Sequence, residues 1–426
     1  MDQAQLQQIL SAAKHARQAG HLGEAAGMLE QALAQAGEVP VVLNALGLTR
    51  LAQSQHREGG ALFRRAIAAD PVSPELWMNL ARALREQGDD AGERQALEGA
   101  LAIDQRHFMA LVRLAELFER RGDAAAAAER WSGVVTLGGM MEERPPALQA
   151  MLEHARDYVA QQRAGFAAAV DSGLLDARGA LTSVERRRVD TCIDHALGRR
   201  TIYANQPAGM HFPFLPADEF FDRGHFPWLE ALEAKTDVIR GELEALLAGE
   251  DTGIRPYVAM EPGTPANKWS PLDHKLDWGA LHLWKDGRRD EAVCARVPQT
   301  AAIVEGLPLS DLPGRTPTVF FSLLRPGTHL PAHTGVSNVR AIIHLPLIVP
   351  PGCAFRVGGE TREWEVGRAW AFDDTIEHEA WNRSDELRAI LIFDVWNPYI
   401  TEAERDLLRR FYTVAGASEG GIAVSD

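Results

Sequence analysis

Residues 340–350 read RAIIHLPLIVP, and their side chains alternate between two faces. One face is wholly apolar and carries Ala341, Ile343, Leu345, Leu347 and Val349. The other carries Arg340, Ile342, His344 and Pro346. A period of two predicts a β-strand that packs one face on a core. An ordinary core avoids Arg and His, so we expect the second face to carry chemistry.

Two further stretches show the same period. Residues 388–396 read RAILIFDVW and residues 318–327 read TVFFSLLRPG. Turn signals separate these strands from their neighbours, at Pro326-Gly327, Pro350-Pro351-Gly352, Gly358-Gly359 and Gly367. Short strands at this spacing predict an antiparallel sandwich or jelly roll.

The N-terminal third has a different character, rich in helix-forming residues and periodic every 34 residues. Four sets of positions keep this spacing: Leu46, Leu80 and Leu114; Gly20, Ser54, Gly88 and Gly122; Ala32, Ala66 and Ala100; and Leu29, Phe63, Leu97 and Trp131. The pattern resembles the tetratricopeptide repeat, a helix–turn–helix unit. Stacks of this kind bind peptides or proteins, so we expect such a partner here.

We therefore predict a multidomain α + β chain. A tetratricopeptide-repeat solenoid covers residues 1–140, a helical connector 141–200, a jelly-roll catalytic domain 201–412, and a flexible tail 413–426.

Composition excludes several classes of protein. Lys plus Arg is 44 and Asp plus Glu is 59, giving a net charge of −15, which argues against a nucleic-acid-binding function. No apolar run reaches about 18 residues, so we expect no membrane span. The first residues do not resemble a signal peptide, and three scattered cysteines do not form a disulfide framework, so we expect a cytoplasmic protein.

Two histidines are candidate metal ligands. His333 follows a strand and a Pro-rich turn, and His378 lies 45 residues later, ten before Arg388. Two imidazoles with a nearby Arg suit iron and a dicarboxylate cosubstrate. The usual facial triad adds a carboxylate two residues after the first His, where this chain has Gly335. Spacing alone leaves two core histidines as an equally good interpretation.

Residues 200–405 contain PGTH, HTG-x-x-N, FDD-x-x-EHE-x-W and DVW-x-P, preceded by DWGALHLWKDGRRDEAVC. With these motifs the chain resembles the aspartyl/asparaginyl β-hydroxylase family of iron(II)- and 2-oxoglutarate-dependent oxygenases. The resemblance implies that the jelly roll is a double-stranded β-helix. The best-known animal member also has tetratricopeptide repeats before this domain, and Gly at the position of Gly335.

The resemblance implies a role for each matching residue. His333 and His378 would bind Fe(II), and Arg388 and Ser322 would bind the distal carboxylate of 2-oxoglutarate, with O2 as the third reactant. His344 would hold the carboxylate beside the metal, and Trp278 would line the cosubstrate site. Alternatives from the residues alone are core packing for Trp278 and an ion pair with Asp394 or Glu386 for Arg388.

The substrate side departs from the family pattern. Trp284, Phe320, Arg340 and Ile342 are our candidate substrate residues. The animal enzyme has a basic pair where this chain has Phe320 and Ile342, which leaves Arg340 as the remaining cation. Of a cysteine pair in the animal enzyme, Cys294 matches one member and Ala301 lies at or near the other.

The leading hypothesis is hydroxylation of an Asp- or Asn-type side chain in a peptide or protein that the repeats bind. One alternative is hydroxylation of a small molecule or lipid, which Phe320 and Ile342 favour. Two others are a non-catalytic repeat adaptor and a halogenase, because Gly335 leaves room for a halide.

Overall fold

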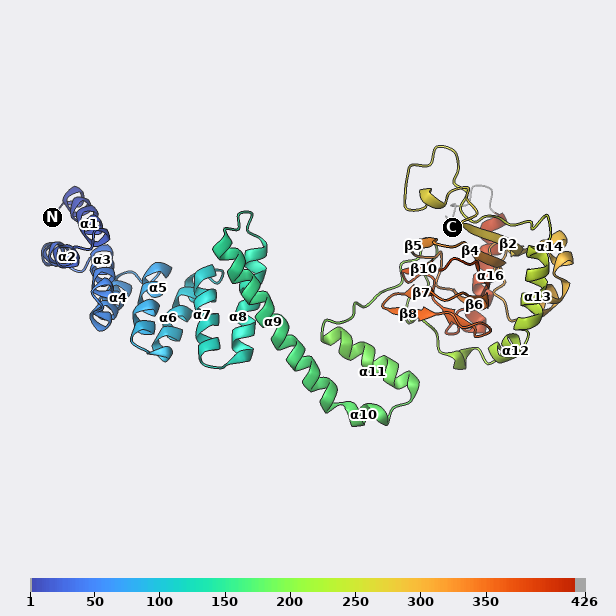
Figure 1. Cartoon of the computed structure of the whole chain (residues 1–426), viewed down its shortest axis with the longest axis horizontal. Coiled ribbons are helices and arrows are strands. Elements are labelled where there is room, and N and C mark those ends of the chain that lie inside the picture. Colours follow the sequence, from blue (N-terminus) through green and yellow to red (C-terminus); the bar gives the residue numbers. More distant parts are fainter. Residues whose placement is uncertain (1, 418–426) are drawn as a thin grey trace. The chain divides into compact units, whose positions relative to one another are not determined.

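A computed structural model describes residues 2–417 of the 426-residue chain (Figure 1). The chain forms two compact units that divide between Ala180 and Leu181. Each unit is described separately below.

The first unit is a series of antiparallel helix pairs (Figure 1). Its helices are α1 (Gln3–Gln18), α2 (Leu22–Ala36), α3 (Pro40–Ala52), α4 (His56–Ala69), α5 (Pro74–Glu86), α6 (Asp90–Ile103), α7 (Phe108–Arg120) and α8 (Ala124–Gly139). Helices α3, α5 and α7 begin at residues 40, 74 and 108, and α2, α4, α6 and α8 at 22, 56, 90 and 124. This 34-residue interval confirms the predicted helix–turn–helix repeat.

The repeated residues explain the geometry of each pair. The turn positions all have positive φ: 85° at Gly20, 61° at Ser54, 73° at Gly88 and 74° at Gly122. The second helix of each pair carries another repeated position, and all four of these residues are buried in a continuous core: Leu29, Phe63, Leu97 and Trp131. A Cβ atom on Gly47 would lie 2.6 Å from the Phe63 ring, so a glycine lets α3 and α4 approach closely.

The predicted connector is divided between the two units. Helices α9 (Pro146–Gly173) and α10 (Leu175–Gly179) belong to the first unit, while α11 (Ser183–Ala196) belongs to the second. Arg187 of α11 donates a 2.7 Å hydrogen bond to the Phe220 carbonyl and pairs with Glu360 at 3.0 Å. The second unit therefore begins at Leu181, about twenty residues before the start at residue 201 that the sequence predicts.

The second unit contains two antiparallel sheets, as predicted. The larger sheet has the order β1-β2-β4-β11-β6-β9, with β3 paired to β2, and the smaller has the order β5-β10-β7-β8. Their strands are β1 (Arg255–Pro256), β2 (Trp278–Lys285), β3 (Arg288–Arg289), β4 (Val319–Leu324), β5 (His329–His333), β6 (Arg340–Ile348), β7 (Cys353–Val357), β8 (Glu360–Glu363), β9 (Trp370–Phe372), β10 (His378–Asn382) and β11 (Arg388–Trp396). The two-sheet arrangement is compatible with a jelly roll.

Alternation places the two faces of β6 and β11 in different environments. The predicted apolar faces are buried in a core with α12 (Leu229–Glu233), α13 (Thr236–Leu247), α14 (Glu291–Arg296) and α15 (Pro298–Glu305). The opposite faces line a cavity. Two 3-10 turns, η1 (Arg223–His225) and η2 (Ser270–Leu272), complete the connections.

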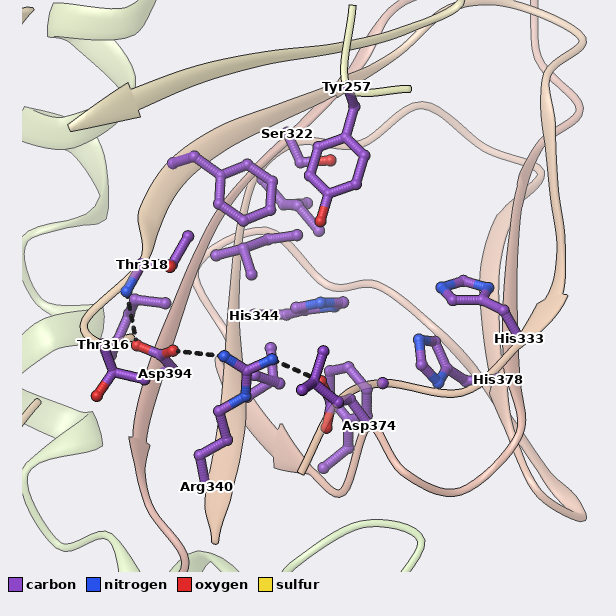
Figure 2. Close-up of a pocket in the computed structure, with 18 of the residues that line it drawn as sticks. Tyr257, Thr316, Thr318, Ser322, His333, Arg340, His344, Asp374, His378 and Asp394 are labelled. Atoms are coloured by element: carbon purple, nitrogen blue, oxygen red, sulfur yellow. Dashed lines mark hydrogen bonds and ion pairs between the residues drawn. The ribbon is translucent and has the colours of Figure 1, made fainter. Parts of the chain in front are cut away.

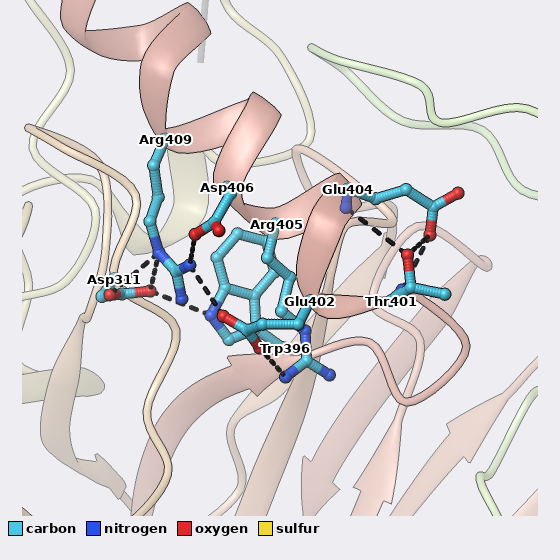
Figure 3. A network of polar contacts seen from close by, with 8 residues as sticks. All are labelled: Asp311, Trp396, Thr401, Glu402, Glu404, Arg405, Asp406 and Arg409. Atoms are coloured by element: carbon cyan, nitrogen blue, oxygen red, sulfur yellow. Dashed lines mark hydrogen bonds and ion pairs between the residues drawn. The ribbon is translucent and has the colours of Figure 1, made fainter.

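Helix α16 (Glu402–Ala417) is held against β11 (Figure 3). The guanidinium groups of Arg405 and Arg409 lie 5.6 and 5.3 Å from the ring centre of Trp396, and Arg409 also pairs with Asp311 at 3.0 Å. The helix includes residues 413–417, which we had placed in a flexible tail. Residues 418–426 of that predicted tail lie outside the described residues.

Over residues 2–417, no helix is both long and apolar enough to cross a bilayer. All three cysteines are free thiols, with Cys294 and Cys353 buried and Cys192 exposed.

Candidate active site

A cavity of about 680 Å³ lies in the second unit, lined by both sheets (Figure 2). It brings together nine of the ten residues predicted from the sequence: Trp278, Phe320, Ser322, His333, Arg340, Ile342, His344, His378 and Arg388. Trp284 is the exception.

The two candidate metal ligands lie side by side. His333 ends β5 and His378 begins β10, and the two residues are register partners whose ring centres are 4.1 Å apart. Each Nδ1 lies within hydrogen-bond distance of a carbonyl two residues earlier, at 2.7 Å from Pro331 O and 3.0 Å from Ile376 O. Because a carbonyl only accepts, each Nδ1 carries the proton and each Nε2 keeps a free lone pair.

Burial keeps the imidazole rings of His333 and His378 neutral. Burial lowers the pKa of His333 to about 3, with a further contribution from His378. Burial also lowers the pKa of His378 to about 4. Neutral imidazoles are the form that binds metals, so this pair suits a metal ion. No cluster of three His, Cys, Asp or Glu side chains suited to a metal occurs among the described residues.

Gly335, at the position of the usual third ligand, faces another carboxylate. A Cβ atom on Gly335 would overlap the carboxylate of Asp374. Asp374 is 7% exposed, and its Oδ1 is buried without a hydrogen-bond partner. Burial raises the pKa of Asp374, an effect that Arg340 opposes. A carboxylate from the loop before β10 therefore occupies the space that a side chain at position 335 would need.

Arg388, at the start of β11, is a buried cation without a carboxylate. It is 1% exposed, and its Nη1 donates only long 3.4 Å hydrogen bonds to the carbonyl and hydroxyl oxygens of Ser322. Its Nε is buried without a partner. Burial lowers the pKa of Arg388 to about 10, which still leaves it charged at pH 7. No described ion pair joins it to Glu386 or Asp394, so the alternative of a structural salt bridge is not supported.

The groups around Arg388 are arranged as donors. Trp278 Nε1 donates a 3.1 Å hydrogen bond to Ser322 Oγ, which leaves the hydroxyl proton of Ser322 to donate elsewhere. His344 Nδ1 and Trp364 Nε1 are buried without partners. The guanidinium of Arg388 lies 4.9 Å from the ring centre of Trp364. This end of the cavity therefore has the chemistry of an anion receptor.

Arg340 faces the cavity but is engaged by carboxylates. Its Nη1 donates a 3.1 Å hydrogen bond to Asp394, and its Nη2 lies 3.5 Å from Asp374 (Figure 2). Asp394 also accepts a 2.9 Å hydrogen bond from the backbone N–H of Thr318. Burial raises the pKa of Asp394 to about 6. Two carboxyl groups thus compensate one guanidinium.

Trp284 lies in the apolar core on the opposite face of the sheet, which corrects its prediction as a substrate residue. The guanidinium of Arg289 lies 5.5 Å from its ring centre. A shift of register between His282 and Trp284 reverses the alternation of β2 at this point. His282 lines the cavity instead.

Sequence analysis missed several cavity residues, among them Asp374, Trp364, Tyr257 and His282. Asp374 and Trp364 lie outside the strands, where no alternation in the sequence predicts which way a side chain points. Tyr257 directly follows the short strand β1. His282 carried a usable signal, because it lies four residues after Trp278 in the same alternating strand.

Part of the second unit is similar to known proteins. Residues 233–398 match the family model described as aspartyl/asparaginyl beta-hydroxylase. The mouse aspartyl/asparaginyl beta-hydroxylase is 41% identical over 136 residues, which is 32% of this chain and 18% of that protein. The ornithine lipid ester-linked acyl 2-hydroxylase of Rhizobium tropici is 34% identical over 182 residues, or 42% of this chain and 60% of that protein.

The chain thus spans less than two thirds of these curated relatives. Among solved structures, one of MamA gives a TM-score of 0.30 at 16% identity, covering 35% of this chain and 90% of that one. The matched region contains β2 to β11 and every predicted ligand in the cavity. Residues 233–398 are therefore similar to the aspartyl/asparaginyl beta-hydroxylase family, and this region holds the candidate site.

Proposed function

We propose that this protein is an iron(II)- and 2-oxoglutarate-dependent dioxygenase that hydroxylates a C–H bond. One observation carries the proposal. Within the described residues, two neutral imidazoles whose Nε2 atoms make no hydrogen bond share a cavity with a buried guanidinium that no carboxylate pairs. The first feature suits a divalent metal, and the second suits a carboxylate.

The residues divide between metal and cosubstrate. His333 and His378 would hold Fe(II) through Nε2, while their Nδ1–H groups fix the ring orientations. Arg388 and Ser322 would bind the distal carboxylate of 2-oxoglutarate, and His344 the carboxylate beside the metal. When bound, iron(II), 2-oxoglutarate and O2 supply the oxidising chemistry, and the protein binds, orients and excludes water.

The substrate side favours a neutral, apolar substrate. Phe320 and Ile342 are at most 9% exposed and present no charge. Arg340 is already compensated by Asp374 and Asp394. A substrate carboxylate placed against Phe320 and Ile342 would be desolvated beside a guanidinium that is already paired, which is costly. The name of the Rhizobium relative, an acyl hydroxylase, agrees with an acyl chain as substrate.

A second candidate substrate is an Asp- or Asn-type side chain in a peptide or protein. The 41% identity to the mouse aspartyl/asparaginyl beta-hydroxylase favours it. In this version, the helical repeats of the first unit would bind the peptide, as such stacks commonly do.

The test compares substrates with one protein preparation. Purified full-length protein receives Fe(II), ascorbate and 2-oxoglutarate, and succinate is measured with an acyl ester or with peptides carrying Asp, Asn or Leu. The proposal predicts succinate formation that the ester or the Leu peptide stimulates more than the Asp peptide. Strong preference for Asp that survives Arg340→Leu would restore the second candidate. Absence of succinate under all conditions would favour the non-catalytic adaptor.

A further inference from the structure

One wall of the cavity is a continuous series of aromatic rings. It begins at His333, whose ring centre is 4.8 Å from that of Trp269, and Trp269 is 5.9 Å from Trp278. Trp278 stacks on Tyr257 at 3.8 Å. The wall therefore leads directly away from the proposed metal ligand, along one side of the cavity.

Beyond Tyr257 the wall continues onto β4 and β2. Tyr257 lies 5.4 Å from Phe320, and Phe320 stacks on His282 at 5.0 Å with an interplanar angle of 25°. Tyr257 and His282 are themselves nearly parallel, 6.4 Å apart. A row of stacked and tilted rings of this length forms an extended, largely apolar surface, which suits an extended chain better than a compact charged group.

Two polar groups on this wall are uncommitted. Figure 2 shows the Tyr257 hydroxyl directed into the cavity. Within the part of the chain that the structure describes, neither this hydroxyl nor either ring nitrogen of His282 has a hydrogen-bond partner. Arg340, by contrast, is engaged by Asp394 and Asp374. A phenol and an imidazole thus supply uncharged hydrogen-bonding capacity on this wall.

Both groups are uncharged at neutral pH. Burial, with a contribution from Lys285, lowers the pKa of His282 to about 4. Tyr257 is 43% exposed, and desolvation of its hydroxyl raises its pKa above the usual value. A hydroxyl and a neutral imidazole donate to a carbonyl without requiring a counter-charge, whereas neither of them supplies the positive charge that a carboxylate needs.

We propose that Tyr257 and His282 select the substrate by hydrogen bonding a neutral carbonyl, as in an acyl ester, while the attached apolar chain packs along Phe320 and Ile342. This inference rests on the hydroxylase function proposed above, because it places the chain in the cavity of the metal ligands. It assigns specificity to two residues outside the metal and cosubstrate groups.

The test measures binding to the full chain. Methyl octanoate and octanoate are titrated anaerobically into protein loaded with Fe(II) and 2-oxoglutarate, and tryptophan fluorescence reports Kd. Tyr257→Phe and His282→Phe keep the aromatic surface but lose the hydrogen bonds. Tyr158→Phe, in α9 of the first unit, is the matched control. KM and kcat for the ester are measured separately on the same variants.

We expect wild-type protein to bind the ester at least about tenfold more tightly than the carboxylate. Each of the two variants should weaken ester binding by about three- to tenfold, mainly through KM, and leave octanoate binding little changed. Equal affinity for ester and carboxylate, or tighter binding of an Asp or Asn peptide, would overturn the inference. If wild-type protein consumes 2-oxoglutarate but does not bind the ester, the inference fails while the proposed function stands.

Discussion

The guanidinium of Arg340 donates a 3.1 Å hydrogen bond to the buried carboxylate of Asp394. Asp394 is 2% exposed, and the backbone N–H of Thr318 supports it from the other side. From the sequence, Arg340 is the remaining candidate cation for an acidic substrate. The ion pair with Asp394 holds its guanidinium in place. In the function proposed above, the charge of Arg340 therefore stabilises the cavity and does not recognise a substrate carboxylate.

Replacing Arg340 should destabilise the second unit. Arg340→Leu leaves Asp394 and Asp374 buried without their cation, which should lower the free energy of unfolding by about 3–5 kcal/mol at pH 7. The pKa of Asp394 is about 6 in the folded state, so the loss should be smaller at pH 5, where that carboxyl is largely protonated. Urea denaturation at both pH values checks this. An equal loss at both would show that the ion pair is not responsible.

Arg388 should control the 2-oxoglutarate requirement. Loss of one partner of a buried charged pair costs on the order of 3–5 kcal/mol, so Arg388→Ala should raise the concentration needed for half-maximal turnover by at least about a hundredfold. Arg388→Lys should be intermediate, because it keeps charge but loses bidentate geometry. Arg383→Ala, in the loop before β11, is the control. Wild-type dependence on 2-oxoglutarate in Arg388→Ala would make Arg388 a structural residue.

The sequence predicted most of the framework from periodicity. The 34-residue interval placed the helix pairs, and the alternation in residues 340–350 and 388–396 separated core from cavity. Trp284 was misplaced because the register shift after His282 depends on pairing with β4, which no local pattern reveals. Asp374 and Trp364 were missed because they lie outside regular strands, where tertiary contacts decide which way a side chain points.

The pH dependence of stability should identify His282 as a buried neutral imidazole. Its folded pKa is about 4, while an unfolded His has a pKa of about 6.5. Below pH 6.5 the unfolded chain binds a proton that the folded protein does not, so the free energy of unfolding falls between pH 6.5 and 4. His282→Phe lacks this contribution and should lose less stability on acidification. Other histidines act equally in both proteins, so parallel curves would contradict the assignment.

Gly335 should tolerate no side chain. A Cβ atom at this position overlaps the Asp374 carboxylate, so Gly335→Ala should cost about 1–3 kcal/mol of unfolding free energy. Gly241→Ala, in α13, meets nothing within 4 Å and should be stabilising by about 0.5–1 kcal/mol. Thermal unfolding of both variants provides the comparison. Equal midpoints would mean that Asp374 moves aside without cost.

The most direct test of the account is iron binding by His378→Ala. Full-length protein is dialysed anaerobically against graded Fe(II) with 2-oxoglutarate, and bound iron per chain is measured. Wild-type protein and a His274→Ala control, outside the cavity, should bind one iron each. His378→Ala should bind it more than about a hundredfold less tightly, since loss of an outer partner alone costs roughly 10–100-fold. Unchanged iron affinity and succinate formation in His378→Ala would contradict the account.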